Sequence, residues 1–165
     1  MMKALFGFEY DDLWKAIIRP PRDDYEEADL GAKEFLVNKS IRVIRTDLVL
    51  LNQRKHRIKC SLWEPRNRKC KLLPCVVYLH GNSSSRVEAV HEVRNLLPLN
   101  ICLFAFDFSG CGQSDGEFIS LGWHETGDVA CVVDYLRKSV FKYLKYRTKS
   151  QLSVYGDDQW EQLLQ

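Results

Sequence analysis

The sequence predicts an α/β fold, in which helices flank a mostly parallel sheet that begins with an antiparallel pair of strands. First, apolar strand-like runs alternate with helical runs after Pro74, which implies right-handed crossovers between parallel strands. Second, apolar and polar residues alternate at 58–63, as in a half-buried antiparallel strand. Third, 165 residues with 45% hydrophobic content can bury roughly 70% of their unfolded surface in one core.

The first element expected along the chain is a short helix, which Asp11 or Asp12 can cap. Pro20 must end this helix, because proline disfavours helical geometry in the residue before it. One side of the helix is apolar and consists of Leu13, Trp14, Ile17 and Ile18. We expect a polar linker from there to about Lys39.

The sheet is expected to begin with strands at 41–51 and 58–63. Both strands are expected to lie at the edge of the sheet. Parallel strands follow from Pro74 to the turn at His80, at 101–106 and at 151–156. Ser85 and Glu88 form a capping-box pattern that opens the first intervening helix. The second helix is indicated by apolar residues three and four apart: Val129, Val132, Val133, Leu136 and Val140.

A Gly-x-Ser-x-Gly pattern occurs once, at 112–116, and its context argues against a serine nucleophile. A nucleophile elbow is a sharp turn between a strand and the helix that follows at once. Here the expected strand ends at Asp107, and residues 117–122 separate the pattern from the next helix. Ser114 is therefore expected in the middle of a loop, where it is not a nucleophile.

Three segments around this pattern carry a resemblance to a known family. They are the turn His80-Gly81-Asn82, the segment 107–116 with the form Asp-x-x-Gly-x-Gly-x-Ser-x-Gly, and the lead-in at 14–22. Together they resemble the α/β-hydrolase superfamily, most closely the serine-aminopeptidase-like hydrolases of family S33. The resemblance extends from Leu13 to Tyr155.

The resemblance implies roles for the matching residues. Gly81 and Asn82, with Ser83 next to them, correspond to a turn that supplies one backbone N–H of an oxyanion hole. His80 orients that turn and is not a general base. The resemblance gives the loop at 107–116 a structural role. The residues expected to have this role are Asp107, Gly110, Gly112, Ser114 and Gly116.

The family places its nucleophile directly after the strand that corresponds to 151–156, and its acid and histidine later in the chain. At that position the sequence reads Gly156-Asp157-Asp158-Gln159-Trp160, so Asp158 stands where the nucleophile is expected. An aspartate nucleophile would need a downstream histidine to activate water, and none follows among the 165 residues. Trp160 also replaces the second elbow glycine.

The chain is therefore expected to be the N-terminal half of a truncated or diverged serine hydrolase, inactive by itself. Full-length relatives would hydrolyse ester, amide or peptide bonds through an acyl-enzyme. The alternative is a non-catalytic pseudoenzyme that acts as a binding or regulatory module. The expected organisation is a lead-in at 1–39, the half-domain at 40–156 and a diverged tail at 157–165.

Composition excludes several other classes. No apolar run reaches the roughly 18 residues of a membrane span and no signal peptide is evident, so a cytoplasmic location is expected. Asp115 replaces the last glycine of a dinucleotide-binding pattern, and no Walker motif or metal-ligand spacing occurs. No cofactor or metal is expected. The six cysteines include no Cys-x-x-Cys pair and are expected to be reduced, and Cys111 is not expected to be a nucleophile.

Two features bear on partners. A basic cluster near the C-terminus is interpreted as a solvated helix face, with contact to an anionic membrane as the weaker alternative and no nucleic acid expected. The uncharged strand at 152–155 would leave an open sheet edge, through which the chain is expected to self-associate. The basic cluster consists of Arg137, Lys138, Lys142, Lys145, Arg147 and Lys149.

Overall fold

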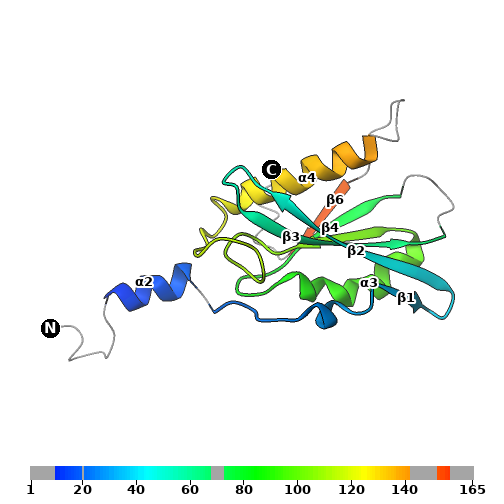
Figure 1. Ribbon diagram of the computed structural model, residues 1–165, viewed down its shortest axis with the longest axis horizontal. Coiled ribbons are helices and arrows are strands. Elements are labelled where there is room, and N and C mark those ends of the chain that lie inside the picture. Colours follow the sequence, from blue (N-terminus) through cyan, green and yellow to red (C-terminus); the bar gives the residue numbers. More distant parts are fainter. Residues whose placement is uncertain (1–9, 20, 68–72, 142–151, 157–165) are drawn as a thin grey trace.

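A computed structural model of the chain describes residues 10–19, 21–67, 73–141 and 152–156 (Figure 1). The helices are α2 (Tyr10–Ile18), α3 (Val90–Leu96) and α4 (Glu125–Phe141), with 3-10 turns η1 (Glu27–Leu30), η2 (Arg86–Ala89) and η3 (Leu97–Leu99). The strands are β1 (Glu34–Val37), β2 (Ile41–Leu51), β3 (Arg57–Pro65), β4 (Cys75–Leu79), β5 (Cys102–Phe106) and β6 (Leu152–Gly156).

These strands form one sheet in the order β1-β2-β3-β5-β4-β6. The neighbours β1–β2, β2–β3 and β3–β5 pair antiparallel, while β4 pairs parallel with both β5 and β6. The α/β class and the antiparallel N-terminal strands are therefore confirmed. Among the described strands, the parallel part of the sheet is confined to β4, β5 and β6.

The segment expected to be a polar linker to Lys39 contains regular structure, so that expectation is wrong. The turn η1 buries Leu30, and β1 buries Val37 while it pairs with the start of β2. The edge positions assigned to β2 and β3 are also wrong, since β1 covers the outer side of β2 and β3 lies between β2 and β5. The reason is that β1 has only four residues, too few to show an alternating pattern.

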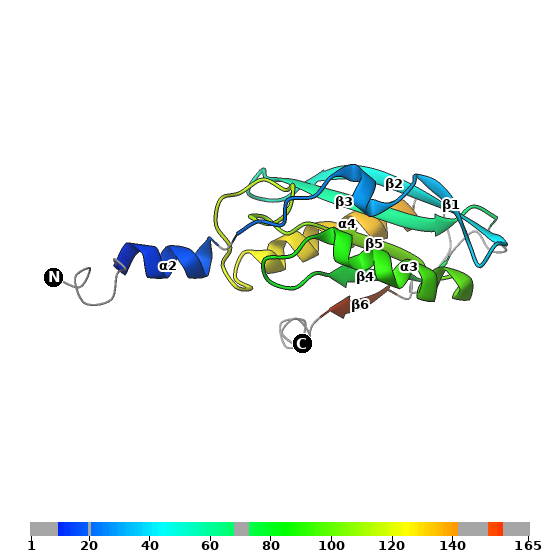
Figure 2. The ribbon, with the colours of Figure 1, turned by 90° about the horizontal axis from the view of Figure 1, so that it is seen from below.

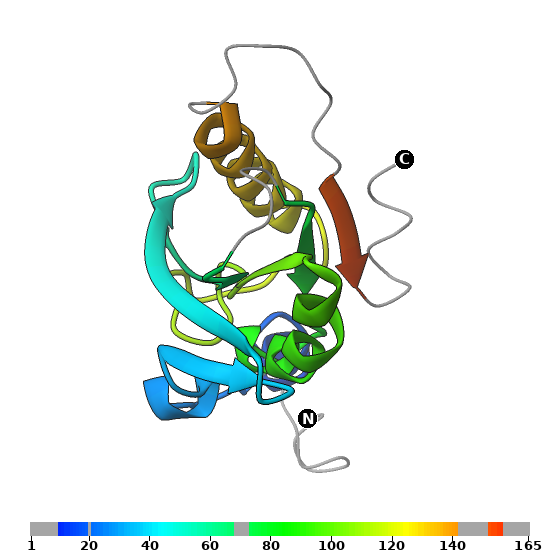
Figure 3. The same ribbon diagram turned by 90° about the vertical axis from the view of Figure 1, so that its right-hand side faces the viewer.

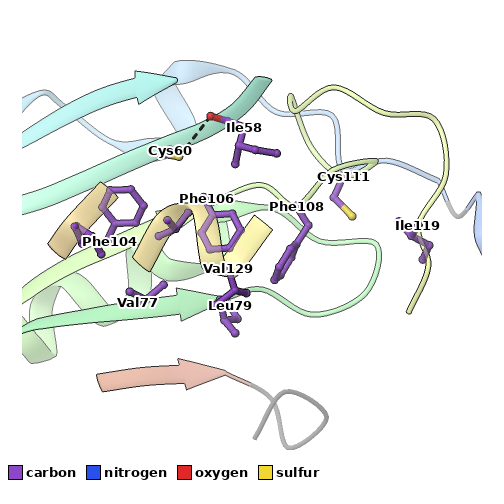
Figure 4. Packing of buried hydrophobic residues seen from close by; sticks show 12 residues of the cluster. Ile58, Cys60, Val77, Leu79, Phe104, Phe106, Phe108, Cys111, Ile119 and Val129 are labelled. Atoms are coloured by element: carbon purple, nitrogen blue, oxygen red, sulfur yellow. Dashed lines mark hydrogen bonds between the residues drawn. The ribbon is translucent and has the colours of Figure 1, made fainter. Parts of the chain in front are cut away.

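The core has two layers, one on each face of the sheet. Figure 3 shows α4 on one side of the sheet and α3 on the other. In β5, Phe104 and Phe106 belong to the cluster under α4, while Leu103 and Ala105 belong to the cluster under α3. All residues of β5 are buried, and burial of each phenylalanine contributes about 2–3 kcal/mol. Figure 4 shows Phe106 beside Val129 of α4, with Phe104 further along the strand in the same cluster.

The N-terminal helix stands apart from these layers. In Figures 1 and 2, α2 projects from the body of the molecule beyond the loop that follows β5. Leu13 and Ile17 of this helix are exposed. From Pro21 onward the chain returns along the body, where residues 22–25 contact the loop; we refer to residues 22–25 as the strap.

Candidate functional site

The candidate site lies at the edge of the sheet where the parallel strands end. In the β4–β6 register Leu79 lies opposite Gly156, and in the β4–β5 register Tyr78 lies opposite Ala105. The turn after β4, the start of the loop after β5 and the last residue of β6, Gly156, therefore lie at the same edge of the sheet. Ligands of open α/β sheets bind beyond such carboxyl ends.

His80 begins the turn after β4 and is buried with 1% exposure. Its Nε2 accepts a hydrogen bond from the backbone N–H of Phe108 at 3.1 Å, so its Nδ1 carries the proton and donates to the carbonyl of Gly81 at 2.8 Å. Burial lowers the pKa of His80 and favours this neutral form. Both ring nitrogens are thus occupied in joining the turn to the loop, and neither is available as a base.

The predicted oxyanion turn is a tight turn in which Ser84 N–H donates to the carbonyl of Gly81 at 3.3 Å. The two predicted residues differ in what their N–H groups do. The Gly81 N–H donates to Glu88 Oε2 at 3.1 Å, whereas the Asn82 N–H has no acceptor among the described residues. Asn82 is exposed, and the next residue, Ser83, has a left-handed φ of 60°. Of the predicted pair, Asn82 is therefore the residue with an available donor.

Glu88 was predicted to close a capping box with Ser85, and the structure uses it differently. The Ser85 hydroxyl accepts from the N–H of Val87 at 3.3 Å, while the Glu88 carboxylate bonds to Gly81. The cap of η2 is therefore only half of the expected box. Glu88 therefore stabilises the turn after β4. The capping-box pattern in the sequence does not indicate that role.

Asp107 is the buried centre of the site's hydrogen bonds. Its carboxylate accepts from the Tyr25 hydroxyl at 2.6 Å, from Arg86 N–H at 2.7 Å and from Gln113 N–H at 3.0 Å, and the Arg86 guanidinium lies 3.4 Å away. Burial, and then the charge of Asp107, raise the pKa of Tyr25, which keeps its hydroxyl a donor. Asp107 thus connects the strap, the loop and the start of η2.

Ser114 is buried in the middle of the loop, with 2% exposure. Its hydroxyl donates to the carbonyl of Asp107 at 2.7 Å and accepts from the N–H of Lys59 at 2.9 Å. Gly112 has φ 43°, and a Cβ there would lie 2.6 Å from the Asp107 carboxylate carbon. At Gly110 and Gly116 a Cβ would meet backbone atoms of other loop residues at 2.7 Å and 2.9 Å. Of the loop residues named from the sequence, Gly112 therefore lies against the Asp107 carboxylate and Ser114 bonds to the Asp107 backbone, while Gly110 and Gly116 pack against other atoms of the loop and its surroundings.

The strap contributes contacts that the sequence did not reveal. Arg22 donates to the carbonyls of Ser114 at 3.0 Å and Gly112 at 3.4 Å, and also to that of Gly116. The backbone carbonyl of Tyr25 accepts from the Gln113 side chain at 2.8 Å. The partners are about ninety positions apart in sequence, so no local pattern could have paired them.

A second buried carboxylate fixes the other side of the loop. Asp128 accepts from the Asn52 amide at 2.6 Å and from the Ser109 N–H at 2.9 Å. Asp115, at the surface, forms a bidentate ion pair with Arg57, and hydrogen bonds from the Arg57 side chain and backbone lower the pKa of that carboxyl. Neither carboxylate faces the Gly81–Asn82 turn, so both stabilise the loop.

Cys111 lies in the loop between two glycines and is buried. Burial raises the pKa of its thiol to about 11, with a further contribution from Glu125. A thiol with such a pKa is protonated near neutral pH and is a poor nucleophile.

Several predicted residues lie outside the described part of the chain. Asp157, Asp158 and Trp160, which decide the elbow, are among them, as are Lys142, Lys145, Arg147 and Lys149. Of the basic cluster, Arg137 and Lys138 are described, and both are exposed on α4. Within the described ranges no group of His, Cys, Asp and Glu is placed to hold a metal ion, and no helix has the length and apolarity to cross a bilayer.

No protein-family model and no curated protein matches this sequence. Solved structures do match it in fold. The esterase Pf2001 of Pyrococcus furiosus superposes with a TM-score of 0.54 and 24% identity over 84% of this chain and 48% of its own. XC6422 of Xanthomonas campestris, described as an α/β serine hydrolase without a lid, has a TM-score of 0.53 and 18% identity over 68% of this chain and 50% of its own. This chain spans about half the length of these structures.

Proposed function

Because the described chain has the fold of the first part of an α/β-hydrolase, we propose that it supplies the oxyanion-hole half of a serine hydrolase of the S33-like type. The reaction class is hydrolysis of an ester, amide or peptide bond. Asn82 would donate its backbone N–H to the developing oxyanion, with Glu88 and His80 as positioning residues for the turn. A cytoplasmic location belongs to the same proposal.

One observation carries this proposal, namely the register of β4 with β6. Since Leu79 lies opposite Gly156, β6 ends next to the start of the turn that holds Asn82. An oxyanion hole needs two donors close together, one from such a turn and one from the residue after the nucleophile. The second donor would therefore come from the segment that begins at Asp157.

The proposal also includes inactivity of residues 1–165 by themselves. Asp158 occupies the expected nucleophile position, and no histidine follows it among these residues. Loss of a nucleophile removes about a millionfold of rate in serine hydrolases. Purified 1–165 is expected to turn over neither p-nitrophenyl esters nor aminoacyl-anilides. Turnover that Ser114→Ala abolishes would instead make the loop serine a nucleophile and contradict its structural role.

A second candidate function is a non-catalytic binding or regulatory module. The observation that favours it is the residue pair Asp158 and Trp160, which replaces both the nucleophile and a close-packing glycine of an elbow. Sequencing of the transcript across the codons for 155–165 separates the two candidates. A frame that runs into Gly-x-Ser-x-Gly supports the hydrolase, and a frame that reads Asp158-Gln159-Trp160 and lacks a later histidine supports the module.

If a longer frame exists, its product allows a direct test of Asn82. Asn82→Pro removes the backbone N–H at the second position of a tight turn, where proline is well tolerated. It should lower kcat by about 100- to 1000-fold, the effect of losing one oxyanion donor. Asn82→Ala keeps the N–H and should retain activity. Equal activity of the two variants would exclude this N–H from the reaction.

A further inference from the structure

Exposed apolar side chains gather at one end of the molecule. Of the nine large apolar residues that are exposed among the described residues, six lie at the end where β4 and β5 finish. Leu51 belongs to this set because it pairs with Arg57, beyond the end of β5. The other five form what we call the end surface: Leu13, Ile17, Phe118, Leu121 and Trp123.

Contacts join α2 to the loop within the end surface. The loop is joined to α2 by a hydrogen bond from Ile119 N–H to the carbonyl of Ile18 at 2.8 Å. The Arg19 guanidinium lies 6.0 Å from the ring of Phe118. A cavity of about 310 Å³ is lined by both Trp123 and Arg54 of the β2–β3 hairpin. In Figure 2, α2 and the loop lie at the same end of the molecule.

The exposure of Trp123 is extreme for an indole, at 83%. Large apolar side chains that cluster in water mark surfaces that bind something. Tryptophan is enriched where one environment is apolar and the other aqueous, as at a membrane interface. Leu121 is 60% exposed and has a left-handed φ of 52°, so the backbone holds an apolar side chain out toward solvent.

The basic residues at this end are Lys15, Arg19, Arg54, Lys55 and Arg57, and they outnumber the acids Asp11, Asp12, Asp115 and Glu117, which favours an anionic partner. The surface carboxylates Asp115 and Glu117 are each paired with an arginine, at 3.0 Å and 2.9 Å. Lys15 and Lys55 are exposed and have no acidic partner among the described residues. The end surface therefore presents apolar side chains together with unpaired positive charge.

From this combination we propose that the end surface docks on an anionic phospholipid membrane. Apolar side chains would enter the headgroup region, and the lysines would contact anionic headgroups at its rim. This docking is independent of the proposed hydrolase function, since it requires neither a nucleophile nor a substrate. It also differs from the membrane contact expected through the basic cluster, whose described members Arg137 and Lys138 lie on α4, over one face of the sheet.

The test is sedimentation of the chain with vesicles of phosphatidylcholine, with or without phosphatidylserine. Binding is expected to phosphatidylserine-containing vesicles and to be much weaker to phosphatidylcholine alone. Leu121→Ser should lower the partition constant by about tenfold, in line with the burial of one leucine. Leu99→Ser is the matched control, because Leu99 is 67% exposed but precedes β5 at the opposite end; its binding should equal that of the wild type.

A second pair of variants tests the contribution of the lysine charges to membrane binding. Lys55→Ser should lower binding to phosphatidylserine vesicles by about fivefold, the effect of one basic residue near an anionic surface. Lys39→Ser is the control, since Lys39 is also exposed with a left-handed φ, 59° against 63°, but lies in the β1–β2 turn. Circular dichroism of every variant checks that the fold is retained.

Three results would overturn the proposal. The first is failure of the wild type to bind either vesicle. The second is a wild-type dimer that Trp123→Ser converts to a monomer, which would assign the end surface to a second copy of the chain. The third is loss of binding in Arg137→Ser/Lys138→Ser together with wild-type binding in Lys55→Ser, which would place the lipid contact on α4.

Discussion

Replacement of Gly112 by alanine tests whether the Asp107 carboxylate fills the space next to this glycine. An added Cβ would lie 2.6 Å from the carboxylate carbon and 2.7 Å and 2.8 Å from its oxygens. Contacts this short cannot persist, so the carboxylate has to move. It is held by Tyr25, Arg86 and Gln113, and movement would break at least one hydrogen bond to a charged group.

The cost has two parts that can be separated. The left-handed φ of 43° costs an alanine about 1–2 kcal/mol, and a lost hydrogen bond to a buried carboxylate costs about 1.5–3 kcal/mol. Gly112→Ala should therefore lower the free energy of unfolding by about 2.5–5 kcal/mol. Asp107→Ala is the control background, because there the added Cβ no longer meets a carboxylate and Gly112→Ala should cost only the first part.

Urea denaturation followed by tryptophan fluorescence measures both variants, with the buried Trp63 as a reporter. A loss in Gly112→Ala that persists undiminished in the Asp107→Ala background would refute the reasoning, because it would mean that the carboxylate moves aside at no cost.

Four further outcomes are expected. Gly127→Ala, in the first turn of α4 with no atom within 4 Å of the added Cβ, should stabilise the chain by about 0.5 kcal/mol in urea denaturation; a loss of stability would contradict the helical placement. Ser114→Ala should cost about 1–3 kcal/mol because it leaves the Lys59 N–H without its acceptor, and an unchanged urea midpoint would show that this hydroxyl is dispensable. Because burial lowers the pKa of His80, the folded state binds fewer protons than the unfolded one; stability should fall by up to about 1.4 kcal/mol per pH unit below pH ~6.5, and a His80→Asn variant with the same pH slope would disprove this linkage. Light scattering after size exclusion should show association that grows with concentration, since β6 has β4 on only one side among the described strands; a monomer at all concentrations would mean that this edge is protected.

Features that depend on neighbouring residues were predictable from the sequence. The alternation around Cys60 identified β3, and the apolar spacing from Val129 to Leu136 identified α4. The motif at 107–116 located Ser114 in a loop because a nucleophile elbow needs a helix directly after it. These signals repeat within a few residues, so a single sequence is enough to carry them.

The missed features depend on contacts between distant parts of the chain. Tyr25 and Asp107 are 82 positions apart, and nothing near either residue indicates the other. Glu88 was misassigned because its local pattern fits a capping box, while the folded chain offers it the Gly81 N–H. Asn82 could be distinguished from Gly81 as the residue with an available donor only after the hydrogen-bond partner of each N–H group was known.

The strap also has a consequence for the order in which the molecule folds. Arg22 bonds to carbonyl groups 90 to 94 positions later in the chain, so these bonds close a very long loop. Closure of a loop of this length costs about 4 kcal/mol of chain entropy. Formation of the sheet has to offset most of this entropy cost before the strap can bind. The strands are therefore expected to assemble first, and the shape of the turn and loop to become fixed in a late, slow step.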